Sequence, residues 1–512
     1  MRDSNQHSGC FLIGLVTITV LGLFVVFFPQ LLHWVVFGLI FRNSVVWLTI
    51  IVAFASLVMT HSARRTARWV SLSTCILFAF ASLFMVFNNH AIEKHRLVNQ
   101  QVYHSFEALP EDMTVVRTPY QVAQRKIEST FSKPGYQPGE VEPINEPLQG
   151  TGWVAPHQPQ GLRWGRGKVD GVTILSRDLN ATQVAGELTY VENGFAWNSV
   201  EWRVQFTVPG STVDEVYLIR SGDSVLRVAS LISYDFSFPV FVPKWGGVVI
   251  VNPDGSMERL TPEESASRFP GQPLFPLSLA EKIGDGFYHK ESIFPILNGY
   301  QGATKIPGTY GEGNTMPYIV GPYMFIGLTP YNGGTGLVNQ LIIDGVNGEM
   351  LLRRIETGQN FKGPQPAINS MRQIPLIGHT YQIYDDLGQV STPGDTIIIE
   401  PVPVARKSTD GQTEFWWAGT AVSTDYEHVR FIAVANPKSN VVYRFETYNQ
   451  LEQFLQGREV GLRYENSQNT GEATEPGGMS PDTGTDLSQL SDEELMELDT
   501  SIKEELYRRL KN

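Results

Sequence analysis

Long uncharged apolar segments are confined to the first 90 residues of this chain. They cover residues 11–28, 45–60 and 69–88, and none of them contains Asp, Glu, Lys or Arg. Because about 20 apolar residues are needed to cross the roughly 30 Å hydrocarbon core of a bilayer, the pattern predicts an N-terminal α-helical membrane anchor of about three spans over residues 1–90. Residues 29–41 are apolar but too short to span, which favours a re-entrant or interfacial stretch.

The placement of arginines gives this anchor an orientation. Arg64, Arg65 and Arg68 lie between the second and third apolar segments, and positively charged short loops stay in the cytoplasm. The sequence therefore predicts an integral membrane protein with a cytoplasmic N-terminus and a body outside, in the cell envelope. A cleavable signal peptide is the alternative for residues 11–28, but Arg2 is the only Lys or Arg ahead of them and no A-x-A-like site follows.

Beyond residue 90 the pattern changes to short periodic segments. Residues 91–167 are expected to hold a membrane-proximal helix at 119–132 and then a Pro/Gly-rich extended connector. Residues 168–465 favour an α+β, β-rich extracytoplasmic body. Within it, residues 200–208 place apolar side chains at alternate positions, which predicts a strand.

Three segments of the body share a strand–turn–strand layout. Their turns open at Asn252, Asp344 and Asn436, which follow one another at intervals of 92 residues. Asx side chains cap the backbone of a tight turn, and Gly or Asn tolerates positive φ at its end. Helical segments are expected after the first unit, at 261–269, and after the third, at 448–455. The even spacing predicts internal repeats, although Gly/Pro/Asn-rich β proteins also form such hairpins without duplication.

This unit resembles the PepSY type of extracytoplasmic module, and residues 341–350 (LIIDGVNGEM) carry the nearest match. The resemblance implies a small α+β fold and a role in binding or inhibiting partners rather than in catalysis. The third copy, whose turn opens at Asn436, departs from the pattern because it lacks the expected glycine.

A polar segment and an amphipathic helix are expected at the end of the chain. Residues 466–486 contain almost no large apolar residue and predict a disordered linker. Residues 487–512 predict a C-terminal helix with a capping box at its start. Its apolar stripe consists of Leu495, Leu498, Ile502, Leu506 and Leu510. A lone helix cannot bury such a stripe, so it is expected to self-associate as a coiled coil in a homo-oligomer, to dock on the body, or to bind a partner.

Charge and cysteine content narrow the function classes. The formal net charge is −13, and phosphate binding needs clustered cations, so no binding to nucleic acid is expected. Both cysteines, Cys10 and Cys75, lie in the predicted anchor. The body is therefore expected to have no disulfide, no thiol nucleophile and no metal held by cysteine.

Signatures of catalysis and cofactor binding are lacking, since the sequence contains no HExxH, GxSxG, Walker or GxGxxG motif. No cofactor and no metal are expected, and the catalytic residues stay unassigned. Two polar clusters offer side chains for acid–base or metal chemistry. They are Asp285, His289 and Glu291, and Asp425, Glu427 and His428. Solvated loop residues are the simpler interpretation of both clusters.

Aromatic residues supply the candidate binding surface. They are Tyr318, Tyr323, Phe325, Tyr331, Trp416 and Trp417. Exposed aromatic residues bind partners or glycans, whereas aromatics that alternate along strands more often belong to a core.

Together these features favour a non-enzymatic, membrane-anchored extracytoplasmic binding or scaffold protein. Its expected partners are the lipid bilayer and a protein or envelope component. The alternatives are an envelope-located hydrolase that uses carboxylate and His residues, and a structural subunit of a larger membrane or virion assembly.

Overall fold

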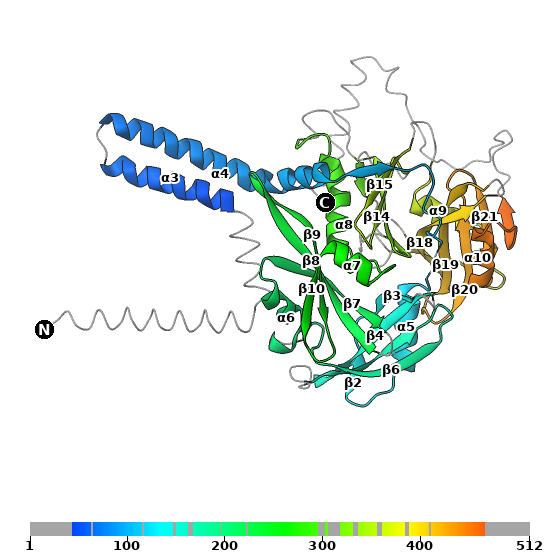
Figure 1. Ribbon diagram of the computed structural model, residues 1–512. Coiled ribbons are helices and arrows are strands. Elements are labelled where there is room, and N and C mark those ends of the chain that lie inside the picture. Colours follow the sequence, from blue (N-terminus) through cyan, green and yellow to red (C-terminus); the bar gives the residue numbers. More distant parts are fainter. Residues whose placement is uncertain are drawn as a thin grey trace, which may run out of the picture. The chain divides into compact units, whose positions relative to one another are not determined.

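The computed structural model describes residues 44–62, 65–114, 117–146, 150–161, 167–194, 196–221, 224–294, 303–305, 318–330, 336–355, 361–384, 389–408 and 411–465 (Figure 1). The chain divides into two units, Met1–Asn466 and Ser467–Asn512, and every described residue belongs to the first. This first unit is built from short β-sheets with helices packed against them.

Two helices begin the described part of the chain, α3 (Ser44–Ser62) and α4 (Arg65–Gln100). They lie side by side as an antiparallel pair (Figure 1). Neither contains Gly or Pro, so no helix breaker interrupts them. The last turns of α4 bury Ile92, Leu97 and Val98 in the core of the β-rich part.

Among the described residues, no helix combines the length and the apolar composition of a membrane-crossing segment. The second and third predicted spans fall on α3 and α4, and the first, residues 11–28, lies outside the described residues. The predicted fold class with its three-span anchor is therefore wrong, and so is the predicted localisation as an integral membrane protein. The apolar residues 69–88 are only part of a longer helix, because α4 continues to Gln100 and its last turns pack in a protein core.

Residues 136–188 form a sheet with the order β2–β4–β5–β6, in which β3 also pairs with β4. Its strands are β2 (Tyr136–Pro138), β3 (Glu142–Glu146), β4 (Gly150–Pro159), β5 (Val169–Leu175) and β6 (Ala181–Leu188). Much of the connector expected at 133–165 thus consists of paired strands. Pro138 and Pro143 lie on β2 and β3. Among the described residues each of these strands pairs on one side only, and a missing backbone N–H is tolerated on an unpaired side.

Helix α5 (Tyr120–Thr130) confirms the helix expected at 119–132. It buries Ala123 and Ile127 against this sheet. Val122 packs instead with residues of β18 and β19, so α5 bridges two sheets.

A second sheet is an antiparallel meander with the order β10–β9–β8–β7. Its strands are β7 (Ser211–Ser221), β8 (Ser224–Ser237), β9 (Val240–Val251) and β10 (Met257–Leu260). The helical turns near it are η3 (Ala196–Asn198), α6 (Val200–Thr207) and α7 (Pro262–Arg268).

Residues 200–207 form helix α6 rather than the predicted strand. The Oγ of Ser199 accepts a hydrogen bond from the backbone N of Trp202 at 3.1 Å and so caps the helix. Val200 and Val204 are one helical turn apart and both are buried. Alternating apolar positions include every fourth residue, so the same pattern also fits a helix.

The third sheet has the order β1–β15–β14–β13–β11, with β12 also paired to β13. Its strands are β1 (Tyr103–Ser105), β11 (Ala303–Lys305), β12 (Tyr318–Val320), β13 (Tyr323–Pro330), β14 (Asn339–Asp344) and β15 (Met350–Arg354). Met324 and Ile326 pack in a core shared with α4 and α8 (Leu277–Gly286), which continues into η4 (Phe287–His289). Phe325, between them, packs in a core shared with α9 (Pro364–Met371).

The fourth sheet is antiparallel and follows chain order from β18 to β22. Its strands are β18 (Thr396–Lys407), β19 (Thr413–Ser423), β20 (Val429–Ala435), β21 (Val441–Phe445) and β22 (Leu462–Glu465). Helix α9 packs on one face, and α10 (Tyr448–Leu455) packs on the other. A separate two-stranded hairpin joins β16 (Ile383–Tyr384) and β17 (Val390–Thr392).

Each of the three strand–turn–strand segments forms an antiparallel hairpin: β9–β10, β14–β15 and β20–β21. The side-chain oxygens of Asp344 and Asn436 accept backbone N–H bonds two residues on, both at 2.8 Å. In the first turn Asp254, rather than Asn252, takes this role. The hairpins belong to three different sheets, and the internal duplication stays a prediction.

Candidate functional site

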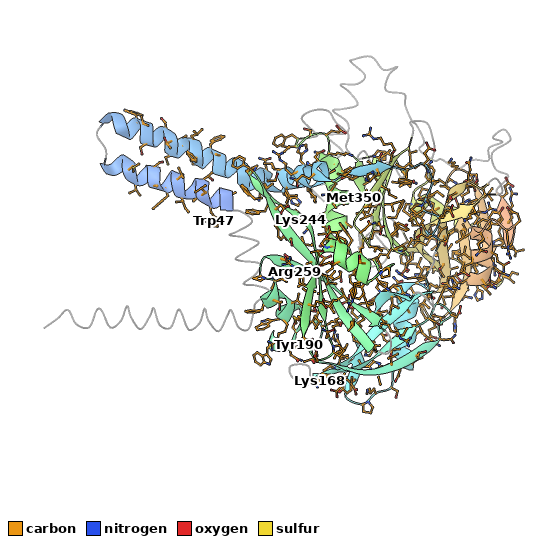
Figure 2. All side chains as sticks on the ribbon, in the orientation of Figure 1. Trp47, Lys168, Tyr190, Lys244, Arg259 and Met350 are labelled. Atoms are coloured by element: carbon orange, nitrogen blue, oxygen red, sulfur yellow. The ribbon has the colours of Figure 1, made fainter. Side chains whose placement is uncertain are left out.

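Large apolar side chains are exposed along α3 and the first half of α4, and we call this surface the apolar helix pair. Its members are Trp47, Leu48, Ile50, Ile51, Phe54, Leu57, Val58 and Met59 on α3, and Trp69, Val70, Leu72, Ile76, Leu77 and Phe80 on α4. The exposed fraction reaches 67% at Phe54 and 72% at Phe80. Figure 2, in which Trp47 is labelled, shows that the side chains along this helix pair lie away from the described sheets.

The apolar character of α3 extends around the helix. Leu57, Val58 and Met59 are consecutive and all three are exposed, while successive side chains on a helix point about 100° apart. Val46 is buried, so part of the helix is already covered. Helices that are apolar on every side occur where they are surrounded by other apolar groups. The apolar helix pair is therefore a surface suited to association.

Three hydroxyl groups of the apolar helix pair are bonded to its own backbone. Thr49 Oγ1 donates to the carbonyl of Val46 at 2.8 Å, and Thr74 Oγ1 donates to that of Val70 at 2.9 Å. Ser71 Oγ on α4 donates to the carbonyl of Ser56 on α3 and joins the two helices. These three hydroxyl groups therefore need no further partner for their protons.

Aromatic residues are also exposed at the turn between β8 and β9, residues 236–241, which we call the phenylalanine turn. Phe236 is 55% exposed and Phe238 is 66% exposed, and the Phe236 and Phe241 ring centroids lie 5.0 Å apart. Gln100 Nε2 at the end of α4 donates to Ser237 Oγ at 3.0 Å. The exposed ring is the unusual feature in the sequence, because Phe238 stands in a turn, where small or polar residues and Pro are usual.

Most of the aromatic residues predicted to form a binding surface lie in cores. Phe325 and Trp417 are fully buried, and their ring centroids lie 5.9 Å apart in an edge-to-face arrangement. Tyr318 and Tyr323 are partly buried against the same core.

Trp416 points to the opposite face of its sheet. It is 3% exposed, and its ring centroid lies 5.4 Å from that of Phe454 on α10. Tyr331 lies outside the described residues. The aromatic content of these strands therefore reflects packing between sheets and helices, and the described residues do not bring this set together on the surface.

The cluster Asp285, His289 and Glu291 makes local structural contacts. Asp285 Oδ2 lies 3.7 Å from Lys94 Nζ on α4. His289 Nδ1 lies 3.2 Å from the carbonyl oxygen of Ile293, and burial lowers the pKa of His289. Glu291 acts electrostatically on its neighbour Lys290.

The cluster Asp425, Glu427 and His428 forms the turn between β19 and β20. Asp425 Oδ1 accepts hydrogen bonds from Ser423 Oγ and from the backbone N of Glu427, the latter at 3.1 Å. The Ser423 bond lowers the pKa of Asp425. Glu427 Oε1 lies 3.2 Å from Arg125 Nη2 on α5. Within the described ranges, no three His, Cys, Asp or Glu side chains are arranged to hold a metal ion.

An Asp–His–Arg cluster at the surface has no signal in the sequence, because its members are far apart along the chain. Asp395 carboxylate contacts His379 Nδ1, and Arg430 Nη1 lies 2.6 Å from His379 Nε2. The hydrogen bond from His379 is the main cause that lowers the pKa of Asp395 to about 2. Because Arg430 is a donor only, it fixes Nε2 as an acceptor and leaves no ring nitrogen for a substrate proton.

The predicted partner helix, with Leu495, Leu498, Ile502, Leu506 and Leu510, lies outside the described residues. No protein-family model matches this chain, and no match is found among curated proteins. The resemblance to PepSY modules stays a prediction.

Proposed function

We propose that this protein is a scaffold that binds other protein chains through the apolar helix pair. The observation that carries the proposal is the exposure of large apolar side chains along both helices and around α3. Monomeric proteins rarely leave a continuous apolar surface of this kind uncovered. The chemistry of the partner surface is therefore apolar.

The hydroxyl bonding within the pair favours a helical partner. Thr49, Thr74 and Ser71 direct their protons to carbonyls within the pair. A strand edge brings unpaired backbone groups and needs hydrogen-bonding partners, whereas a helix satisfies its own backbone. An amphipathic or fully apolar helix can cover Phe54 and Phe80 without leaving polar groups unpaired.

A charge placed on this surface tests the proposal. Phe54→Glu puts a carboxylate where a partner would bury it, and burial of an unpaired charge is costly. We expect binding to weaken at least about tenfold, which corresponds to roughly 1.4 kcal/mol. Sedimentation of the full chain, isolated together with its partners, should show the wild-type protein in an assembly and the variant as a monomer.

The matched control is Ile377→Glu, because Ile377 is an apolar side chain that is 93% exposed in a loop of the described chain. This variant should sediment like the wild type. A monomeric wild-type chain, or equal behaviour of the two variants, contradicts the proposal.

A further inference from the structure

Two edge strands meet where the β2–β6 sheet packs on the β7–β10 sheet. Within the described chain β3 pairs only with β4, and β7 pairs only with β8. Oε2 of Glu142, the first residue of β3, accepts a hydrogen bond from the backbone N of Leu218 on β7 at 3.0 Å. Leu218 and Ile144 of β3 also share one apolar core. A carboxyl thus occupies the free edge of β7, where a backbone group from another strand would otherwise pair.

A buried ion pair lies next to this contact. Glu192 Oε1 lies 2.7 Å from Arg227 Nε on β8, and the two side chains are 5% and 1% exposed. Glu192 Oε2, Arg227 Nη2 and the hydroxyl of Tyr217 on β7 are buried and have no hydrogen-bonding partner among the described residues. Buried polar groups without partners are uncommon, and they mark this junction as a polar centre rather than a closed core.

A β-bulge in β7 brings two more carboxyls to the same junction. The register between β7 and β8 shifts between Val213 and Val216, and Asp214 and Glu215 occupy the shifted positions. Asp214 Oδ2 accepts a hydrogen bond from the backbone N of Ser278 in the first turn of α8 at 3.1 Å. Bulges redirect side chains and are common next to functional sites.

Acidic groups outnumber basic ones around the Glu142 carboxyl. Glu192, Glu215 and Arg227 act on it directly, and Tyr217 lies within the same electrostatic group. At the margins of the group, Glu201 and Glu140 act on Glu192, Lys282 acts on Asp214, and Arg117 acts on Tyr217.

The excess of acidic groups and their burial favour the protonated, neutral form of these carboxyls. Burial raises the pKa of Glu142 well above its usual range, and the charge of Glu192 raises it further. Burial, aided by the charges of Asp214 and Glu140, raises the pKa of Glu215 to about 7. Burial also raises the pKa of Glu192, against the opposing effect of Arg227.

We propose that β3 is held on β7 by a proton-operated latch, in which neutral Glu142 keeps the two edge strands together and loss of its proton to solvent releases β3. The Leu218 N–H bond taken alone lowers the pKa of Glu142, so release on ionisation comes from burial and from the neighbouring carboxylates. The ionised carboxyl repels Glu192 and Glu215 in a partly buried site, where like charges are less screened than in water. Movement of β3 away from β7 gives the carboxylate access to water. The latch does not depend on the proposed binding role.

The pH dependence of the latch has a definite sign. An ordinary Glu in the open state ionises near pH 4.5, the reference value for this side chain, whereas the closed state keeps its proton to higher pH. The closed state is therefore most favoured below about pH 4.5 and loses its advantage as the pH rises through the raised pKa values.

Hydrogen exchange of the full chain tests the latch. Amide exchange of β3 and β7 should be measured from about pH 5.5 to about pH 8.5 and corrected for the intrinsic pH dependence of amide exchange, with β20 as the internal reference. The corrected protection of β3 and β7 should fall by up to about tenfold for each pH unit, because each unit changes the proton-linked equilibrium by that factor. Protection of β20 should stay constant.

Glu142→Gln mimics the neutral carboxyl and should weaken this pH dependence, leaving only the part that Glu215 and Glu192 contribute. Glu187→Gln, at an exposed carboxyl of the neighbouring β6 that pairs with Lys168, should keep it. If Glu142→Gln does not fold, Glu215→Gln serves in its place and should weaken the pH dependence. Constant protection of wild-type β3, or unchanged pH dependence in the glutamine variant that folds, overturns the proposal.

Discussion

The ammonium group of Lys362 holds the turn between β20 and β21 against α9. Its Nζ donates to the carbonyl of Ser439 at 2.9 Å, to Asn440 Oδ1 at 2.5 Å and to Ser370 Oγ at 3.3 Å. Burial lowers the pKa of Lys362, and a Ser–Lys pair is one arrangement used for nucleophilic catalysis. Here all three protons of the ammonium group have acceptors, so Lys362 serves as a cationic clamp rather than as a base.

Removal of this clamp should destabilise the fold. Lys362→Met keeps the apolar stem but leaves the Ser439 and Asn440 oxygens without their donor. We expect a loss of about 1–3 kcal/mol in the free energy of unfolding, measured in urea. Lys438→Met, in the same turn but exposed, should change the free energy by less than about 0.5 kcal/mol. Equal losses in the two variants would show that the clamp contributes nothing.

Capping residues decide the ends of several helices. Thr261 Oγ1 accepts the backbone N–H of Glu264, and Glu264 Oε2 accepts the backbone N–H of Thr261. This capping box confirms the helix start expected there. Ser199 caps α6 in a similar way. In α6 this cap acts with the burial of Val200 and Val204 to favour helix over strand.

The cap of α6 should therefore be worth a measurable amount of stability. Ser199→Ala removes the acceptor for the backbone N–H of Trp202 and should cost about 1 kcal/mol in the free energy of unfolding. Ser267→Ala is the control, because Ser267 lies exposed within α7 and bonds back to the Glu263 carbonyl at 3.1 Å. That control should be close to neutral. A cost at Ser267 equal to that at Ser199 would contradict the assignment of the cap.

Local signals in the sequence were sufficient to predict several helices and hairpins. The helices at α5, α7 and α10 and the hairpins around Asp344 and Asn436 follow from capping residues, turn residues and apolar spacing. These features act over a few residues, so they can be recognised without knowledge of the tertiary fold.

Elements determined by distant contacts could not be derived in this way. Much of the Pro/Gly-rich segment 133–165 forms strands, because β4 pairs with β2, β3 and β5. The aromatic residues at Phe325 and Trp417 are interior because two sheets and α9 enclose them. The buried pair Glu192–Arg227 joins residues that no sequence motif links.

Over the whole described unit, the sheets bury most of their apolar side chains, whereas the apolar helix pair leaves many exposed. Alternate residues of β13 enter two cores, so both faces of its sheet are covered. α4 likewise buries its final turns, whereas its first half and α3 remain exposed. The sheets bury their apolar residues in shared cores, whereas the exposed apolar side chains of the helix pair would be covered only by contact with a further surface.

A photoreactive amino acid placed at position 54 of the full chain, in the cells that make it, tests this account most directly. Position 377 serves as the control, because Ile377 is exposed and lies away from the helix pair in the chain. The account predicts covalent adducts with protein from position 54 and none from position 377. Absence of protein adducts at position 54, adducts with lipid alone, or equal adducts at both positions would contradict it.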